Sequence, residues 1–340
     1  MSVPPVLSVV IPVYREAELV ETAIVSVSAV LDRMDVGYEI VVVDDGSEDG
    51  TWAVLERLST NTPALHCVSL ARNFGKEAAI LAGLDLALGD AVVLMDADLQ
   101  HPPELIPEMF RFWRDEKVKV VNAVKSHRGR EPIAATLAAR LFYAVFDRLT
   151  GSKLAGHADF KLLDREVVDI YRRLPERNTF FRGLVGWLGF DQVDLPFEVS
   201  DRVSGRSRWS LLRLVRMAVR AIASFSTKPL HFVTGTGLLF FVAASVLAVQ
   251  TLQRKLVGEA VEGFATVILL ILFSSSVLML SLGIVGQYLA QIYEEVKGRP
   301  RYLIQRRTPQ PVAATDIAEA PSLEAKVAAL EAAIKRSQAR

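Results

Sequence analysis

The sequence lacks the features that mark several common protein classes. It has one cysteine, so an internal disulfide framework is excluded, and the apolar setting LHCVSL of Cys67 indicates a buried, unreactive thiol. Its 39 basic and 39 acidic residues leave no net charge, so no general attraction to nucleic acid is expected. The N-terminus has no basic region of the signal-peptide kind, so we expect the first part of the chain to stay in the cytoplasm.

Several catalytic motifs are also missing from the sequence. There is no P-loop, no GxGxxG pattern and no His-Glu-x-x-His pair. His127, His157 and His231 have no metal-ligand spacing, and we expect His101 to shape its loop rather than to bind a metal. Dinucleotide binding of the Rossmann kind and zinc-protease chemistry are therefore not indicated.

Two long runs, residues 232–252 and 263–293, contain no charged residue. Each is longer than the roughly 20 helical residues that cross a hydrocarbon core. The alternative, two buried helices of a soluble core, is the weaker interpretation. We expect a transmembrane hairpin with spans at about 231–252 and 263–289, and its lack of ionisable side chains favours an anchor over a transport path.

Basic residues flank the outer ends of this hairpin. The short connection carries only Arg254 and Lys255, whereas the outer flanks are rich in arginine and lysine: Arg206, Arg208, Arg213, Arg216, Arg220, Lys228, Lys297, Arg299, Arg301, Arg306 and Arg307. This asymmetry predicts that both ends of the chain are cytoplasmic, in a multi-pass protein of the inner (cytoplasmic) membrane.

The first 200 residues alternate between two patterns. Short, Val-rich runs typical of strands lie at 7–12, 39–44, 65–70, 91–96 and 118–124, and helical patterns lie at 16–34, 51–58, 76–88 and 103–113. This alternation predicts an α/β fold with a mostly parallel sheet and helices on both faces. Ligands bind beyond the carboxyl ends of the strands in such sheets, so we expect the polar clusters that follow the strands to meet at one edge.

Asp96 and Asp98 follow the strand at 91–96 and lie one residue apart. Two like charges at one strand end cost free energy unless a cation or hydrogen bonds offset them. Hard divalent ions such as Mg²⁺ take carboxylates together with substrate phosphates, so the pair predicts a seat for a metal and a diphosphate. The other two clusters, residues 12–16 and 44–47, are each also compatible with an ordinary loop or helix cap.

Six segments, taken in order, resemble one enzyme family. VVIPVYREAE, VVVDDGSEDGT, LARNFGKEAAI, LMDADLQHPPE, ADFKLLDREVV and RVSGRSRWS follow the order seen in family 2 glycosyltransferases with the GT-A fold. More narrowly, the chain resembles the polyisoprenyl-phosphate glycosyltransferases, which include dolichol-phosphate mannose synthase and the bactoprenol glucosyltransferases. The resemblance covers residues 6 to about 305.

The resemblance implies roles for particular residues. On the donor side it implies a nucleotide-sugar site formed by Pro12, Tyr14, Glu16, Asp45, Arg72, Lys76 and Asp96. The DXD motif would hold Mg²⁺ or Mn²⁺ through Asp96 and Asp98, with Gln100 as a further ligand. The acceptor phosphate would be held by Arg128, Arg140, Arg202, Ser207 and Arg208, where arginine replaces the usual lysine at position 208. Asp159 and Asp98 would be the catalytic carboxylates.

The chemistry of the acceptor bears on the role of Asp159. A phosphomonoester has a second pKa of about 6, so near neutral pH it is mostly a nucleophilic dianion and needs no strong base. Asp159 could orient cationic groups or the sugar, or could take the residual proton. A single displacement would invert the anomeric centre, which gives a β-linked product from an α-linked donor.

The resemblance and the pattern together predict four parts. These are a catalytic domain at 1–205, an acceptor loop with a basic amphipathic interfacial helix at 206–230, two transmembrane helices within 231–293, and a cytoplasmic tail at 294–340. In the tail, spacings of four and three between Leu323, Val327, Leu330 and Ile334 indicate a short heptad seam or a solvated helix.

The predicted function is transfer of a sugar, with glucose from UDP-glucose favoured, to a polyprenyl phosphate such as undecaprenyl phosphate. Mannose, galactose, amino-arabinose or N-acetylated donors remain open. A processive polysaccharide synthase is disfavoured because GRSRW has no Gln three residues before its second Arg and only two spans follow. A non-catalytic nucleotide-sugar sensor is disfavoured by the intact carboxylates. A homo-oligomer, by resemblance a tetramer, is expected.

Overall fold

The computed structural model describes residues 5–98, 100–125, 157–176, 180–197, 227–257 and 263–308. An eight-stranded sheet is formed by β1 (Leu7–Val13), β2 (Tyr38–Asp44), β3 (Leu65–Leu70), β4 (Ala91–Leu94), β5 (Val120–Lys125), β6 (His157–Asp164), β7 (Gln192–Phe197) and β8 (Ile304–Arg307). The helices of this α/β part are α1 (Val20–Leu31), α2 (Thr51–Asn61), α3 (Lys76–Leu86), the 3₁₀ turn η1 (Pro103–Leu105), α4 (Ile106–Glu116), α6 (Arg165–Arg173) and α7 (Phe181–Trp187).

The strand order is β7-β5-β6-β4-β1-β2-β3-β8. β1 pairs in parallel with β2 and with β4, and β3 continues this parallel set on the other side of β2. β6 runs antiparallel between β4 and β5, and β8 runs antiparallel along β3. The sheet is therefore mostly parallel, as the sequence predicts.

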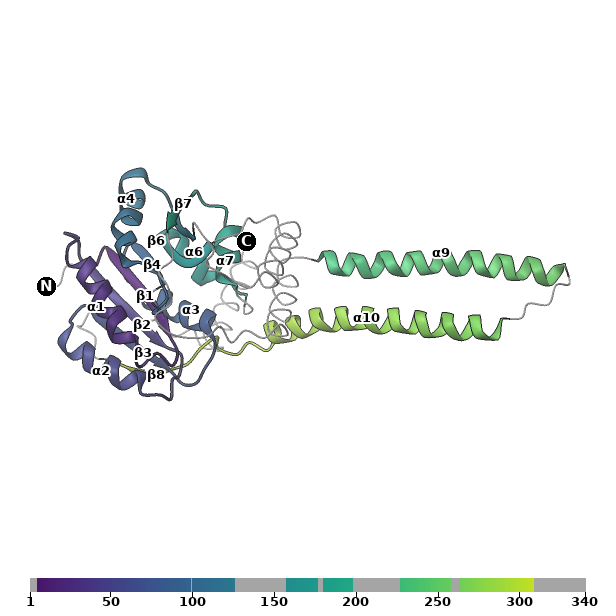
Figure 1. Cartoon of the computed structure of the whole chain (residues 1–340), viewed down its shortest axis with the longest axis horizontal. Helices are drawn as coiled ribbons and strands as arrows, with labels where there is room; N and C mark the ends of the chain where they lie inside the picture. The colour runs from purple at the N-terminus through teal and green to yellow at the C-terminus, as the bar shows by residue number, and fades with distance from the viewer. Residues whose placement is uncertain are drawn as a thin grey trace, which may run out of the picture. The chain divides into compact units, whose positions relative to one another are not determined.

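Both faces of the sheet are covered by helices (Figure 1). The apolar residues of β1 and β2 are buried along nearly their whole length, which is typical of parallel strands packed on both sides. Helices α1, α2 and α4 pack on one face, and α3, α6 and α7 pack on the other. Their core side chains include Ile24, Leu55 and Phe110 on the first face, and Ile80, Val168 and Leu184 on the second.

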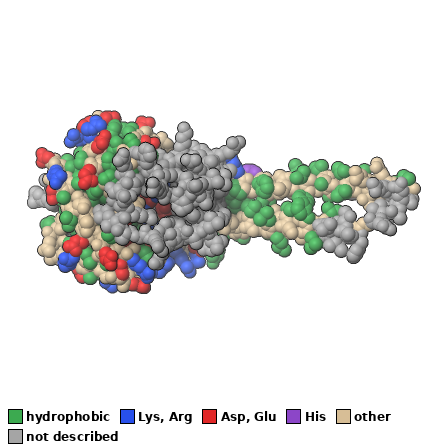
Figure 2. Space-filling model, viewed as in Figure 1, with side chains coloured by type: hydrophobic (Ala, Val, Ile, Leu, Met, Phe, Trp, Pro, Cys, Tyr) green, Lys and Arg blue, Asp and Glu red, His purple; other side chains and the backbone are tan. Residues whose placement is uncertain are grey.

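Two long apolar helices, α9 (Lys228–Leu256) and α10 (Phe264–Val296), follow in the sequence. Their most apolar segments, Lys228–Thr251 and Leu270–Val296, have mean hydropathies of 2.2 and 1.9, and neither is buried within the chain. At 1.5 Å per residue each helix exceeds the roughly 30 Å of a bilayer core. The rings of Phe240 and Phe273 lie 5.4 Å apart, and exposed hydrophobic side chains recur along the described length of both helices (Figure 2).

The structure adds three strands that the sequence analysis does not predict, β6, β7 and β8. The antiparallel β8 extends the sheet at the β3 edge, after α10 in the chain, with residues 297–303 between them. The predicted interfacial helix and the predicted tail seam lie outside the described residues. The division into four parts remains a prediction.

Candidate active site

The carboxyl ends of neighbouring strands bring the predicted motifs together. Tyr14 and Glu16 follow β1, Asp45 follows β2, and Asp96 and Asp98 follow β4. Because β4, β1 and β2 are adjacent in the sheet, these loops lie at one edge. Pro12 is still inside β1, where it pairs with Val43 of β2.

The loop after β2 is fixed by two buried aspartates. The Asp44 carboxylate accepts a hydrogen bond from the Ser47 N–H at 3.0 Å and one from the Ser69 hydroxyl at 2.8 Å. The Asp45 carboxylate accepts from the N–H groups of Phe74 and Gly75 at 2.7 and 2.9 Å. Burial raises the pKa of Asp45, although these N–H groups act in the opposite direction. In this conformation Asp45 positions the RNFGK loop, and its contact with a nucleotide remains a prediction.

Gly46 is required at the turn between these loops. Its φ is +70°, and a Cβ at this position would lie 2.5 Å from the backbone carbonyl carbon of Arg72. Only glycine satisfies both conditions, because it has no Cβ and tolerates positive φ. The turn is closed on its other side by Arg15, whose N–H donates to the Ser47 hydroxyl at 2.8 Å.

Asp159 is the centre of a charged cluster. It is 7% exposed and lies on β6, beside the strand that ends at the DXD motif. Lys76, the first residue of α3, places its Nζ 2.6 Å from an oxygen of Asp159 and 2.6 Å from an oxygen of Asp96. Arg182 on α7 holds Asp159 with two nitrogens: Nε donates to Oδ1, and Nη2 donates to Oδ2 at 2.8 Å. Two cations thus converge on one nearly buried carboxylate.

The electrostatics of this cluster keep Asp159 ionised. Burial alone raises the pKa of Asp159, but the hydrogen bonds from Arg182 and the charge of Lys76 outweigh it and hold the pKa well below its usual range. For Lys76, burial acts to lower the pKa, but the charges of Asp96 and Asp159 outweigh burial, so the pKa is raised above its usual value. Glu77, which accepts the Phe181 N–H at 2.9 Å, has its pKa raised by burial to about 7.

The DXD segment itself is shaped by local hydrogen bonds. Asp98 accepts from the Gln100 N–H at 3.1 Å. The Asp96 N–H donates to Nδ1 of His101, at 3.4 Å, and the His101 ring stacks on Phe160 at 5.3 Å. These contacts of His101, with the backbone of Asp96 and the ring of Phe160, agree with the expectation that it shapes its loop.

Glu16 lies close to several other carboxylates near this segment. Burial raises its pKa, and the charges of Asp98, Asp49 and Asp96 raise it further. Within the described residues, no three His, Cys, Asp or Glu side chains converge closely enough to hold a metal ion by themselves. The arrangement therefore offers carboxylate oxygens but no all-protein cage.

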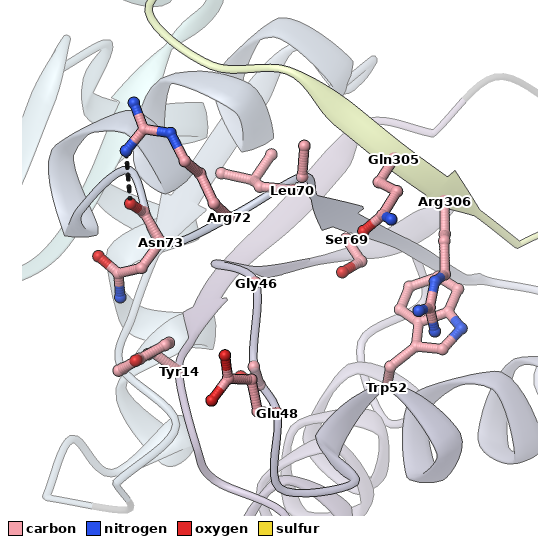
Figure 3. A pocket seen from close by; sticks show the side chains of 12 residues that line it. Tyr14, Gly46, Glu48, Trp52, Ser69, Leu70, Arg72, Asn73, Gln305 and Arg306 are labelled. Carbon is pink, nitrogen blue, oxygen red and sulfur yellow. Dashed lines mark hydrogen bonds between the residues drawn. The ribbon is translucent and has the colours of Figure 1, made fainter.

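A cavity of about 290 Å³ opens beside the β1, β2 and β3 ends. Its lining includes Tyr14 and Arg72 on one side, and Trp52 with Gln305 and Arg306 of β8 on the other (Figure 3). The guanidinium of Arg72 lies over the Phe74 ring at 4.1 Å and donates to the Asn73 carbonyl at 3.2 Å.

The structure does not place every predicted site residue. Arg128, Arg140, Arg202, Ser207 and Arg208 lie outside the described residues. Conversely, the sequence analysis does not single out Arg182 and Glu77, which lie in the charged cluster around Asp159. It also does not predict that Gln305 and Arg306 line the cavity. For Arg182 the available signal was an isolated arginine in the apolar stretch FFRGLVGW.

Comparisons with known proteins extend over most of the chain. Residues 8–171 match the model of the family described as glycosyl transferase family 2. The chain is 40% identical over 303 residues to a Synechocystis protein named as an uncharacterized glycosyltransferase. This match covers 88% of the chain and 94% of the relative. It is also 35% identical over 303 residues to the bactoprenol glucosyl transferase of Shigella phage SfII, in a match that covers 88% of this chain and 97% of the relative. Among solved structures, mannosyl-3-phosphoglycerate synthase from Rubrobacter xylanophilus matches with a TM-score of 0.45 and 24% identity over 65% of this chain and 73% of that one.

Proposed function

The chain belongs to glycosyltransferase family 2, and on that premise we propose that it transfers a sugar from a nucleotide sugar to a polyprenyl phosphate at the membrane surface. Glucose from UDP-glucose is the proposed donor and undecaprenyl phosphate the proposed acceptor. The product is a polyprenyl-phosphate sugar with inverted anomeric configuration.

The observation that carries this proposal is the extent of the match to a bactoprenol glucosyl transferase. That match covers 88% of the chain and 97% of the relative. A contiguous match of this length in a 340-residue chain necessarily includes α9 and α10 as well as the catalytic part. Two exposed apolar helices long enough to cross a bilayer suit an enzyme whose acceptor phosphate is attached to a lipid in that bilayer.

The carboxylates after β4 suit a metal-bound diphosphate. Mg²⁺ is commonly bound by one or two protein carboxylates, with phosphates and waters completing its shell, and the described residues offer two DXD carboxylates rather than a full cage. Asp96 and Asp98, with Gln100, are the residues that would hold Mg²⁺ or Mn²⁺. When bound, such an ion acts as a Lewis acid that stabilises the negative charge developing on the leaving diphosphate.

The proposed reaction is a single displacement. A phosphate oxygen of the acceptor forms a bond to the anomeric carbon, and the bond from that carbon to the diphosphate oxygen breaks. The electron pair leaves with the nucleoside diphosphate. Because the acceptor phosphate is mostly a dianion near pH 7, no proton has to be removed from it.

Asp159 serves this reaction best as an orienting anion. A carboxylate held well below its usual pKa is a weak base, which disfavours proton abstraction. Its negative charge fixes Lys76 and Arg182 at one place, and Lys76 also lies 2.6 Å from Asp96 of the proposed diphosphate site. Preorganised charge of this kind stabilises a transition state without reorganisation during the reaction.

The membrane arrangement completes the proposal. Helices α9 and α10 form a hairpin that crosses the cytoplasmic membrane, with both termini in the cytoplasm. The basic residues Lys297, Arg299 and Arg301 after α10 support this orientation, since such residues remain on the cytoplasmic side.

A direct assay tests the function. The full chain, purified in detergent, is incubated with undecaprenyl phosphate, Mg²⁺ and a panel of radiolabelled nucleotide sugars. We expect label to enter the lipid fraction, with UDP-glucose the best donor. Label in a water-soluble polymer, with none in the lipid, would contradict the proposal and favour a polysaccharide synthase.

A further inference from the structure

The strand that follows the hairpin becomes an edge of the catalytic sheet. β8 pairs antiparallel with β3, with Ser69 opposite Arg306 and Val68 opposite Arg307, and with a register shift between Ser69 and Leu70. The pairing continues past the strand, where the Ala71 N–H donates to the Leu303 carbonyl at 2.8 Å. The backbone of β8 is thereby fixed against the loop that carries Arg72.

Two side chains of β8 form part of the cavity wall. Gln305 and Arg306 extend from β8 toward Ser69 and Trp52, and both line the cavity (Figure 3). Arg307, the next residue, is exposed and does not line it. The contribution of β8 is therefore specific to two positions.

The cavity has an excess of positive charge. Glu48 is the carboxylate in its lining, and it is already paired with Arg15 at 3.2 Å. Among the residues the structure describes, neither Arg72 nor Arg306 has a carboxylate within ion-pair distance. Two arginines thus contribute to the lining of one cavity, and within the described residues neither forms an ion pair.

The position of the cavity relative to the DXD motif identifies which part of a donor it suits. Strands β1, β2 and β3 separate β4 from β8 in the sheet. At about 4.8 Å per strand, β3 lies roughly 14 Å from β4, so the cavity is displaced from the proposed diphosphate seat toward the β3 edge. A nucleotide whose diphosphate lies at Asp96 and Asp98 therefore extends its nucleoside end toward this cavity.

The lining chemistry matches a nucleobase. Trp52 and Tyr14 offer aromatic surface, Gln305 offers both a donor and an acceptor, and Arg306 offers several donors. Base carbonyl and N–H groups are complementary to an amide and a guanidinium placed side by side.

We propose that β8 completes the nucleoside pocket of the donor site, with Gln305 and Arg306 contacting the base and setting nucleotide preference. The inference rests on the proposed function in one respect, namely that the donor is a nucleotide sugar. It adds that β8, the strand that follows the proposed membrane hairpin, supplies residues that determine which nucleotide the catalytic domain binds.

Nucleotide binding to the full-length protein in detergent tests this inference. The dissociation constant for UDP, with Mn²⁺ present, is measured by calorimetry for the parent, for Gln305→Ala and Arg306→Ala, and for the matched control Arg307→Ala. We expect Arg306→Ala and Gln305→Ala each to weaken UDP binding about tenfold, and Arg307→Ala to change it less than twofold. Equal UDP affinity in all four proteins would overturn the inference.

Kinetics and stability separate a binding role from a loss of structure. In the transfer assay, Arg306→Ala should raise the KM for the nucleotide sugar while leaving kcat and the KM for the lipid within twofold. Arg306→Lys should recover part of the affinity, since it restores the charge, and the melting temperature should match that of Arg307→Ala. A fall in kcat with an unchanged donor KM would contradict the inference.

A wider panel distinguishes this inference from the function on which it rests. If the parent transfers sugar and binds UDP but the β8 variants do so equally well, β8 has no part in the pocket and the proposed function stands. If the parent binds none of UDP, GDP, ADP and CDP, the nucleotide-sugar function itself fails.

Discussion

Arg182 holds both carboxylate oxygens of Asp159, although the two residues come from different elements, α7 and β6. A paired, two-point contact fixes the orientation of a carboxylate as well as its charge. Lys76 approaches the same carboxylate and also Asp96, so the orientation of Asp159 sets the position of a cation next to the DXD motif.

Arg182→Ala should therefore lower kcat about 100-fold, in the range found for the loss of one preorganised electrostatic contact. Arg182→Lys keeps the charge but not the two-point contact, so a loss of about tenfold is expected. The measurement is steady-state transfer to undecaprenyl phosphate, with Arg173→Ala on the exposed side of α6 as a matched control. Full activity in Arg182→Ala would show that Asp159 needs no such support.

The pH dependence of transfer tests whether Asp159 or the acceptor phosphate titrates in the range where the enzyme is assayed. Because the pKa of Asp159 lies well below its usual range, it stays ionised from about pH 5 upward and adds no titration there. The acceptor phosphate, with a second pKa of about 6, becomes a better nucleophile as the pH rises through that value. We expect kcat/KM for the lipid to rise from pH 5 to 7 and then level off.

Glu77 needs separate treatment in this experiment, since burial raises its pKa to about 7, within the same window. Glu77→Gln keeps an oxygen that accepts the Phe181 N–H but cannot titrate. The acid limb should persist in Glu77→Gln if it belongs to the acceptor phosphate. Its disappearance in this variant would assign the limb to Glu77 instead.

Gly46 and Gly50 allow backbone strain to be separated from steric clash. Both have positive φ, +70° and +90°, but a Cβ at Gly46 meets the Arg72 backbone at 2.5 Å while a Cβ at Gly50 meets nothing within 4 Å. Gly50→Ala should cost about 1 kcal/mol from φ alone. Gly46→Ala should cost more and should also weaken UDP binding, because it displaces the loop that carries Arg72. Thermal unfolding and calorimetry check both, and equal effects at the two positions would contradict a role for the clash.

The fold was predictable from the sequence where local pattern determines structure. Val-rich runs bounded by turn residues gave β1 to β5, and the polar residues after β1, β2 and β4 lie at one edge as expected. These elements are buried on both faces, so their apolar content is visible without knowledge of the rest of the chain.

The remaining parts depend on contacts distant in sequence. β8, with the sequence IQRR, has little apolar character and forms a strand through its pairing with β3, more than 200 residues earlier. Arg182 lies in a helix rather than after a strand, so the rule that finds ligand-binding residues at strand ends does not reach it. The roles of the nucleotide and acceptor residues remain predictions.

Cys67 makes the membrane orientation directly measurable. It is the single cysteine of the chain, it is 2% exposed, and burial raises the pKa of its thiol to about 12, so it should resist maleimide reagents. A cysteine introduced elsewhere then reports its own position without a cysteine-free background. Two positions suit this test: Val257, which is 77% exposed and follows α9, and Arg299, which follows α10.

If both termini are cytoplasmic, the connection between α9 and α10 lies on the opposite side of the membrane. In spheroplasts, a membrane-impermeant maleimide should label Val257→Cys and leave Arg299→Cys unlabelled until the membrane is permeabilised. The parent, with Cys67 alone, should stay unlabelled in both conditions. Labelling of Arg299→Cys in intact spheroplasts would place the tail outside, away from a cytoplasmic nucleotide-sugar pool. Labelling of neither variant before permeabilisation would mean that the two helices do not cross the membrane, which would remove the argument for a lipid-linked acceptor.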